Sequence, residues 1–187
     1  MWNWFELAAF SSALPMIGAT VLSYAPKARR PKPALTIALY TLGPVILGLF
    51  IAFLWVQLDR PPMRTLGETR LLYSFFLPII GVLMYLRWGF RWILAYATGM
   101  TLLFLFINGL NPENFSKSLM PALVSPWFVP HVVVYIFSYA ILAASALVGV
   151  RGLWLTYMQP SLRKESREVL KTGDQLVYIG YGFLTLG

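Results

Sequence analysis

The sequence predicts an all-α fold: a polytopic bundle of transmembrane helices with five full spans and an incomplete sixth. Of the 187 residues, 58% are hydrophobic and only 12% are charged, and the mean hydropathy is +0.67. A soluble domain carries roughly a quarter charged residues. The excess apolar surface has to face lipid, so residues 1–187 are expected to form a single integral membrane domain.

Apolar runs long enough to cross a bilayer as helices recur along the chain, since a span needs about 20 residues. They are residues 7–25, 33–58, 71–86, 92–110 and 130–151, the last extending to Met158. Gly43-Pro44 lies inside the second run and predicts a kink. The apolar run 175–187 begins a sixth span but stops short. We therefore expect the chain to be the N-terminal part of a longer protein.

Charged residues between the runs indicate the orientation of the spans. Segments on one side hold ten basic residues (27, 29, 30, 32, 87, 91, 163, 164, 167 and 171) and those on the other hold four (60, 64, 70 and 117). The positive-inside rule places the first set in the cytoplasm. The N-terminus and the segments 59–70 and 111–130 are then expected outside a bacterial inner membrane. Residues 161–171 alternate in charge at helical spacing, which predicts a separate interfacial helix before the sixth span.

The inventory of reactive side chains excludes several function classes. The chain has no cysteine and one histidine, which removes disulfides, thiolate metal sites and any supported catalytic triad. The net charge is +8, but no basic helix or aromatic-basic motif accompanies it. We therefore expect lipid phosphates, and no nucleic acid, as the partners of these charges.

His131 is the single histidine, and it lies where an outer loop enters the fifth run. Imidazole is a ready ligand for haem iron or another metal. Trp127 and Tyr135 are close in sequence and offer aromatic surface for a haem. Arginines on the same predicted face offer partners for its propionates: Arg60, Arg64 and Arg70. From these residues alone, an aromatic-belt anchor remains an alternative to haem ligation for His131.

Residues 121–132, followed by Tyr135 and Ser138-Tyr139-Ala140, resemble the cytochrome c assembly protein family, membrane haem handlers of the CcsA and ResC type. The family pattern is a "PAL-S-W---H" loop that leads into a helix. Residues 61–69 resemble a second outer segment, with Arg64 and Thr65 departing from its pattern, and residues 174–187 resemble the helix before the family's tryptophan-rich loop. That loop and a second outer histidine are absent from this chain.

The resemblance implies that His131 is an axial ligand of a b-type haem in transit, with the second ligand missing from this chain. It implies cytochrome c biogenesis, in which haem is presented at the outer face for covalent attachment to apocytochrome c. A second membrane biogenesis subunit is the implied partner. The chain would be at most part of a haem-attachment complex, with no catalytic residues of its own. The alternative is a non-catalytic membrane subunit or a small transporter in which His131 is only interfacial.

Overall fold

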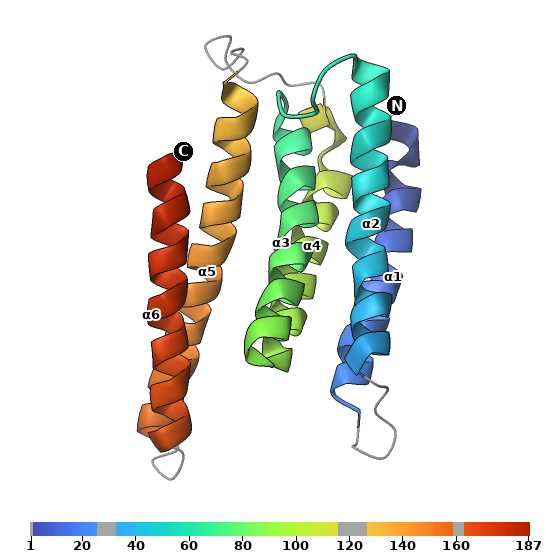
Figure 1. The fold of residues 1–187 in the computed structure, drawn as a ribbon. Coiled ribbons are helices and arrows are strands. Elements are labelled where there is room, and N and C mark those ends of the chain that lie inside the picture. Colours follow the sequence, from blue (N-terminus) through green and yellow to red (C-terminus); the bar gives the residue numbers. More distant parts are fainter. Residues whose placement is uncertain (1, 26–32, 116–126, 159–162) are drawn as a thin grey trace. The chain divides into compact units, whose positions relative to one another are not determined.

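The structure is a computed structural model that describes residues 2–25, 33–115, 127–158 and 163–187. Within these ranges every regular element is helical, which confirms the predicted all-α class (Figure 1). The elements are η1 (Trp2–Trp4), α1 (Phe5–Ser23), α2 (Pro33–Leu58), α3 (Leu66–Trp88), α4 (Arg91–Leu110), η3 (Pro112–Phe115), α5 (Phe128–Met158) and α6 (Arg163–Leu186).

Five helices of the described ranges are long and apolar enough to cross a membrane: Trp2–Ser23, Pro33–Leu58, Leu66–Trp88, Arg91–Leu110 and Pro130–Met158. They correspond to the five predicted spans, so the chain is a multi-pass membrane protein. Pro44 lies inside α2 and does not end it. The chain forms two compact units, Met1–Val129 with α1 to α4 and Pro130–Gly187 with most of α5 and all of α6.

Two helix boundaries differ from the sequence prediction. The helix α3 begins at Leu66, five residues before the predicted start, so Glu68 and Arg70 lie within it. The prediction of a separate interfacial helix at residues 161–171 was wrong about where that helix ends, because α6 runs without a break from Arg163 to Leu186. The first half of α6 is charged and the second half is apolar. Charge alone does not interrupt a helix whose backbone hydrogen bonds continue.

The early start of α3 has a cause in its capping residues. The Thr65 hydroxyl accepts a hydrogen bond from the Glu68 amide at 3.1 Å, and Glu68 Oε2 accepts one from the Thr65 amide at 3.1 Å. This reciprocal capping box satisfies two amides that a helix start leaves unpaired. Arg60 forms a bidentate ion pair with Glu68, in which Nη2 donates to Oε1 at 2.9 Å and Nη1 donates to Oε2 at 3.1 Å. Glu68 is only 1% exposed, so this pair anchors the loop before α3 to the helix.

Small and polar residues bring the helices of the first unit into close antiparallel pairs. Between α1 and α2, a Cβ atom built on Gly43 would lie 2.7 Å from the main-chain oxygen of Ser12. Between α3 and α4, the Asn108 amide donates to the Gly67 oxygen at 2.9 Å, and the Thr101 hydroxyl donates to the Ser74 oxygen at 3.4 Å. Along α3 and along α4, these partners lie seven residues apart. A period of seven is that of left-handed helix pairs, and small side chains let such backbones approach closely.

We expect Gly43→Ala to destabilise the protein by about 2 kcal/mol, because the added methyl group overlaps the α1 backbone in a packed interface. Gly18→Ala is the matched control, since a Cβ there has nothing within 4 Å, and alanine favours helix over glycine. Thermal unfolding in detergent micelles, followed by circular dichroism, gives the comparison. Equal stabilities for the two variants would show that α1 and α2 are not in close contact.

Glu68→Gln should lower the free energy of unfolding by about 3 kcal/mol, because it leaves the Arg60 guanidinium beside a buried neutral group. The same unfolding experiment measures it. Glu6→Gln serves as control, since Glu6 is an exposed carboxylate in the first turn of α1. A loss no larger than that of the control contradicts the anchoring role of the ion pair.

Candidate functional site

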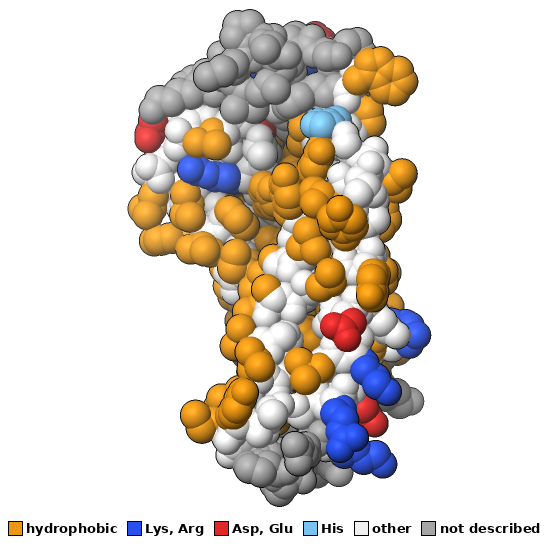
Figure 2. All heavy atoms as spheres, turned by 90° about the vertical axis from the view of Figure 1, so that its left-hand side faces the viewer, with side chains coloured by type: hydrophobic (Ala, Val, Ile, Leu, Met, Phe, Trp, Pro, Cys, Tyr) orange, Lys and Arg blue, Asp and Glu red, His pale blue; other side chains and the backbone are white. Residues whose placement is uncertain are grey.

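His131 lies in the first turn of α5, and its side chain is exposed. Figure 2 shows the imidazole, in pale blue, at one end of the pair formed by α5 and α6. The Lys and Arg side chains of α6 gather toward the other end. The segment 121–126, which carries much of the motif before His131, lies outside the described residues. Trp127 directly precedes α5 and is 80% exposed.

Aromatic rings line the face of α5 that carries His131. The Tyr135 ring lies one turn further along, with its centroid 4.4 Å from that of the imidazole and an interplanar angle of 70°. Tyr139 continues the row, its centroid 5.6 Å from that of Tyr135. The structure therefore brings His131 and Tyr135 together in an edge-to-face pair.

The helices α5 and α6 pack along a seam in which both contribute residues at intervals of seven. From α5 these are His131, Ser138, Ser145 and Gly152, and from α6 and just after it they are Ser166, Gly173, Gly180 and Gly187. The Ser138 hydroxyl donates to the Gly180 oxygen at 2.7 Å, and the Ser166 hydroxyl donates to the Gly152 oxygen at 3.0 Å. These hydrogen bonds fix the register of the pair.

His131 occupies the end of this seam that is nearest the start of α5. Its Nδ1 atom makes a hydrogen bond with an oxygen of Gly187, the last residue of the sequence. A Cβ atom built on Gly187 would lie 3.0 Å from Tyr135 Cε2 and 3.3 Å from Val134 Cγ1. Glycine thus allows the end of α6 to approach the His131–Tyr135 pair closely.

The three predicted propionate partners belong to the first unit and differ in their surroundings. The Arg60 guanidinium is occupied by Glu68 and by the Pro61 oxygen, to which Nη1 donates at 3.1 Å. Arg64 is exposed. Arg70 is partly buried on α3, and its Nη1 atom is buried without a hydrogen-bond acceptor among the described residues. An unpaired buried donor of this kind suits an anionic group.

Within the described ranges no group of three or more His, Asp or Glu side chains is placed to hold a metal ion. A porphyrin supplies four nitrogen ligands of its own, so a single imidazole is enough to bind its iron. An exposed imidazole beside an aromatic ring fits such a group.

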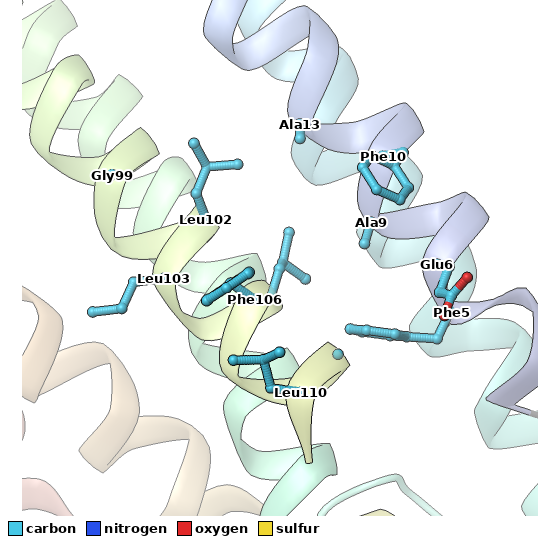
Figure 3. Close-up of a pocket in the computed structure, with 12 residues that line it drawn as sticks. Phe5, Glu6, Ala9, Phe10, Ala13, Gly99, Leu102, Leu103, Phe106 and Leu110 are labelled. Carbon is cyan, nitrogen blue, oxygen red and sulfur yellow. The ribbon is translucent and has the colours of Figure 1, made fainter. Parts of the chain in front are cut away.

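A separate groove lies between α1 and α4, within the first unit (Figure 3). Its volume is about 750 Å³, and apolar side chains such as Phe10, Leu103 and Phe106 line it, with Glu6 as the one ionisable group. None of the predicted site residues lies in it.

Sequence reasoning missed the seam between α5 and α6. The signal was available: small residues recur seven apart at 166, 173, 180 and 187. A spacing of seven predicts that these residues share one face of a continuous α6.

Comparison with known proteins places these residues in a family. Residues 63–187 match the family described as Cytochrome C assembly protein. The "Cytochrome c biogenesis protein CcsA" of Prochlorococcus marinus is 31% identical over 139 residues, which is 73% of this chain and 41% of that protein. The protein of the same name from Phalaenopsis aphrodite subsp. formosana is 28% identical, over 59% of this chain and 35% of its own length. The protein of the same name from Trachelium caeruleum is 29% identical, over 69% of this chain and 40% of its own length.

The chain thus spans about two fifths of the length of the curated relatives that it matches. No solved structure matches it. The family match takes in two thirds of the 187 residues, His131 and the whole α5–α6 seam included. This chain therefore belongs to the cytochrome c assembly protein family.

Proposed function

We propose that this chain acts in cytochrome c biogenesis by holding a b-type haem in transit through His131 and presenting it for attachment to apocytochrome c. The observation that carries the proposal is the exposed imidazole of His131, packed against Tyr135 inside the segment that matches the family. The relatives' printed name, cytochrome c biogenesis protein, supports the same role. Bound haem would supply the vinyl groups to which cytochrome thiols attach.

In this proposal the chain's own residues bind and orient. His131 supplies one axial nitrogen, and Tyr135 and Trp127 supply aromatic surface beside it. Positioning a bound group against its reaction partner lowers the entropic part of a barrier, so a chain that only binds and orients the haem can still promote attachment. We infer at most a share in a haem-attachment complex, with a second membrane subunit as partner.

The haem propionates need cationic partners, and we propose Arg64 and Arg70 for this role. Arg70 has a buried Nη1 atom without an acceptor among the described residues, and Arg64 is exposed. Arg60 is the weakest of the three predicted candidates, because both ends of its guanidinium already donate to Glu68.

We further propose the bacterial inner membrane as the location, with the N-terminus and His131 on the outer side. The support is the distribution of basic residues, ten on one side and four on the other, under the positive-inside rule.

His131→Ala should abolish the Soret absorption of the purified protein after haem loading, because the chain has no other histidine. Free imidazole added to the variant should restore much of the band by filling the vacated position. A Soret spectrum unchanged in His131→Ala would contradict the proposal. It would favour the alternative in which His131 is an interfacial residue of a non-catalytic subunit or transporter.

Arg70→Ala and Arg64→Ala should each weaken haem binding roughly tenfold, since a hydrogen bond to a charged group contributes about 1.5–3 kcal/mol. Haem titration followed by absorbance measures the affinity. Haem dimethyl ester, which lacks the carboxylates, is the control ligand and should bind both variants as it binds the unsubstituted protein. Equal losses for haem and its ester would contradict a role in propionate binding.

A further inference from the structure

We propose that the groove between α1 and α4 binds an acyl chain of an amine-bearing phospholipid of the phosphatidylethanolamine type, whose ammonium group pairs with Glu6. The groove lies within the first unit, and none of the residues proposed for haem binding lines it. The inference is therefore independent of the proposed function.

Glu6 lies at the level of the lipid headgroups. It is in the first turn of α1, directly after the short helix η1 that carries Trp2 and Trp4. Trp4 is exposed, and exposed tryptophans gather where a membrane meets water. The Glu6 side chain is exposed as well, so its carboxylate can meet the charged part of a lipid without entering the hydrocarbon core.

From this boundary the groove extends to about the middle of the bilayer. Figure 3 shows Glu6 at the same end as Phe5 and Leu110, with Ala13 and Gly99 toward the other end. The stretch of α4 from Gly99 to Leu110 rises about 16 Å as helix, and half of the hydrocarbon core is about 15 Å. The groove thus has the depth of one leaflet, which suits a lipid tail better than a transmembrane helix that crosses both leaflets.

Beyond Ala13 and Gly99 a hydrogen-bonded cluster joins the two helices. The hydroxyl oxygens of Thr20 on α1 and Thr98 on α4 lie 3.0 Å apart. The Thr98 hydroxyl donates to the Tyr40 hydroxyl at 3.2 Å, and the Tyr40 hydroxyl donates to a main-chain oxygen of α4 at 3.4 Å. Because these polar groups pair with one another, the end of the groove presents no unpaired hydroxyl to a lipid tail.

The shape of the groove favours a single narrow occupant. Its deepest residues, Phe5 and Leu105, belong to the buried core, whereas Phe10 and Phe106 are exposed. Its volume is about 750 Å³, and a helix about 10 Å across fills roughly 400 Å³ per turn. Lipid tails are as apolar as leucine, so the groove retains a tail through the many dispersion contacts that a concave surface makes with it.

The charge at the groove selects the headgroup. Glu6 is the one ionisable residue among those that line it. An ammonium group donates charge-assisted hydrogen bonds to a carboxylate. The headgroup of phosphatidylglycerol carries a net negative charge instead, which a carboxylate repels. The groove therefore favours phosphatidylethanolamine over phosphatidylglycerol with the same tails.

Native mass spectrometry of the purified protein in detergent micelles measures the lipids that stay bound. Phosphatidylethanolamine and phosphatidylglycerol with identical acyl chains are added in equal amounts. We expect a roughly two- to fivefold preference for phosphatidylethanolamine, which is the size of effect that a partly exposed ion pair gives. Equal retention of the two lipids by the unsubstituted protein overturns the proposal.

Glu6→Gln should remove this preference and leave the total amount of bound lipid nearly unchanged. Asp59→Asn is the matched control, because Asp59 is an exposed carboxylate just after α2 that does not line the groove. Asparagine also tolerates the positive φ of 49° at this position. The control should keep the preference, and a preference lost in both variants or in neither contradicts the role of Glu6.

Gly99→Leu and Gly109→Leu should each expel most of the bound lipid, because both glycines line the groove and a Cβ at either has nothing within 4 Å. Gly18→Leu adds the same side chain at an equally open glycine outside the groove, and it should retain the lipid. Circular dichroism establishes that the three variants are folded. Equal lipid retention by the folded groove variants and the control overturns the proposal and assigns the groove to another occupant, such as a partner helix.

Discussion

The architecture depends on the close approach of antiparallel helices along seams of small residues spaced by seven. Between α3 and α4 and between α5 and α6, hydroxyl or amide groups donate to the main-chain oxygens opposite, as Asn108 does to Gly67 and Ser138 to Gly180. Between α1 and α2, Gly43 lets the two backbones approach. In a bilayer the hydrophobic effect does not drive helices together, so such contacts have to do so. A period of seven, as in the α3–α4 and α5–α6 pairs, keeps the same face toward the partner over several turns and is typical of left-handed pairs.

This packing connects the fold to the proposed chemistry. His131 lies at one end of the α5 seam, where a serine or glycine stands in the other layers, and its Nδ1 atom contacts an oxygen of Gly187, the last residue of the sequence. The imidazole is also held on α5 by its edge-to-face contact with Tyr135. The site that we propose is thus built on rigid elements, which is the arrangement that holds a bound group in a defined geometry.

The sequence predicted the fold class and the five spans, because apolar length is a direct signal. It did not locate the start of α3 or the continuity of α6. In both regions charged residues were interpreted as loop or interfacial positions, whereas Glu68 is buried by its ion pair with Arg60 and the charges of α6 lie on a continuing helix. The sequence also did not indicate that Arg60 pairs with Glu68, eight residues away. That pair depends on the capping box, which places the Glu68 carboxylate beside the loop. Pairings of this kind depend on tertiary geometry that periodicity does not encode.

The central proposal is that His131 binds haem iron, and the most direct measurement is resonance Raman spectroscopy of the haem-loaded protein. With ¹⁵N in both ring nitrogens of histidine, the iron–histidine stretching band should shift to lower frequency, because this chain has one histidine. A band that does not respond to this labelling would contradict the account.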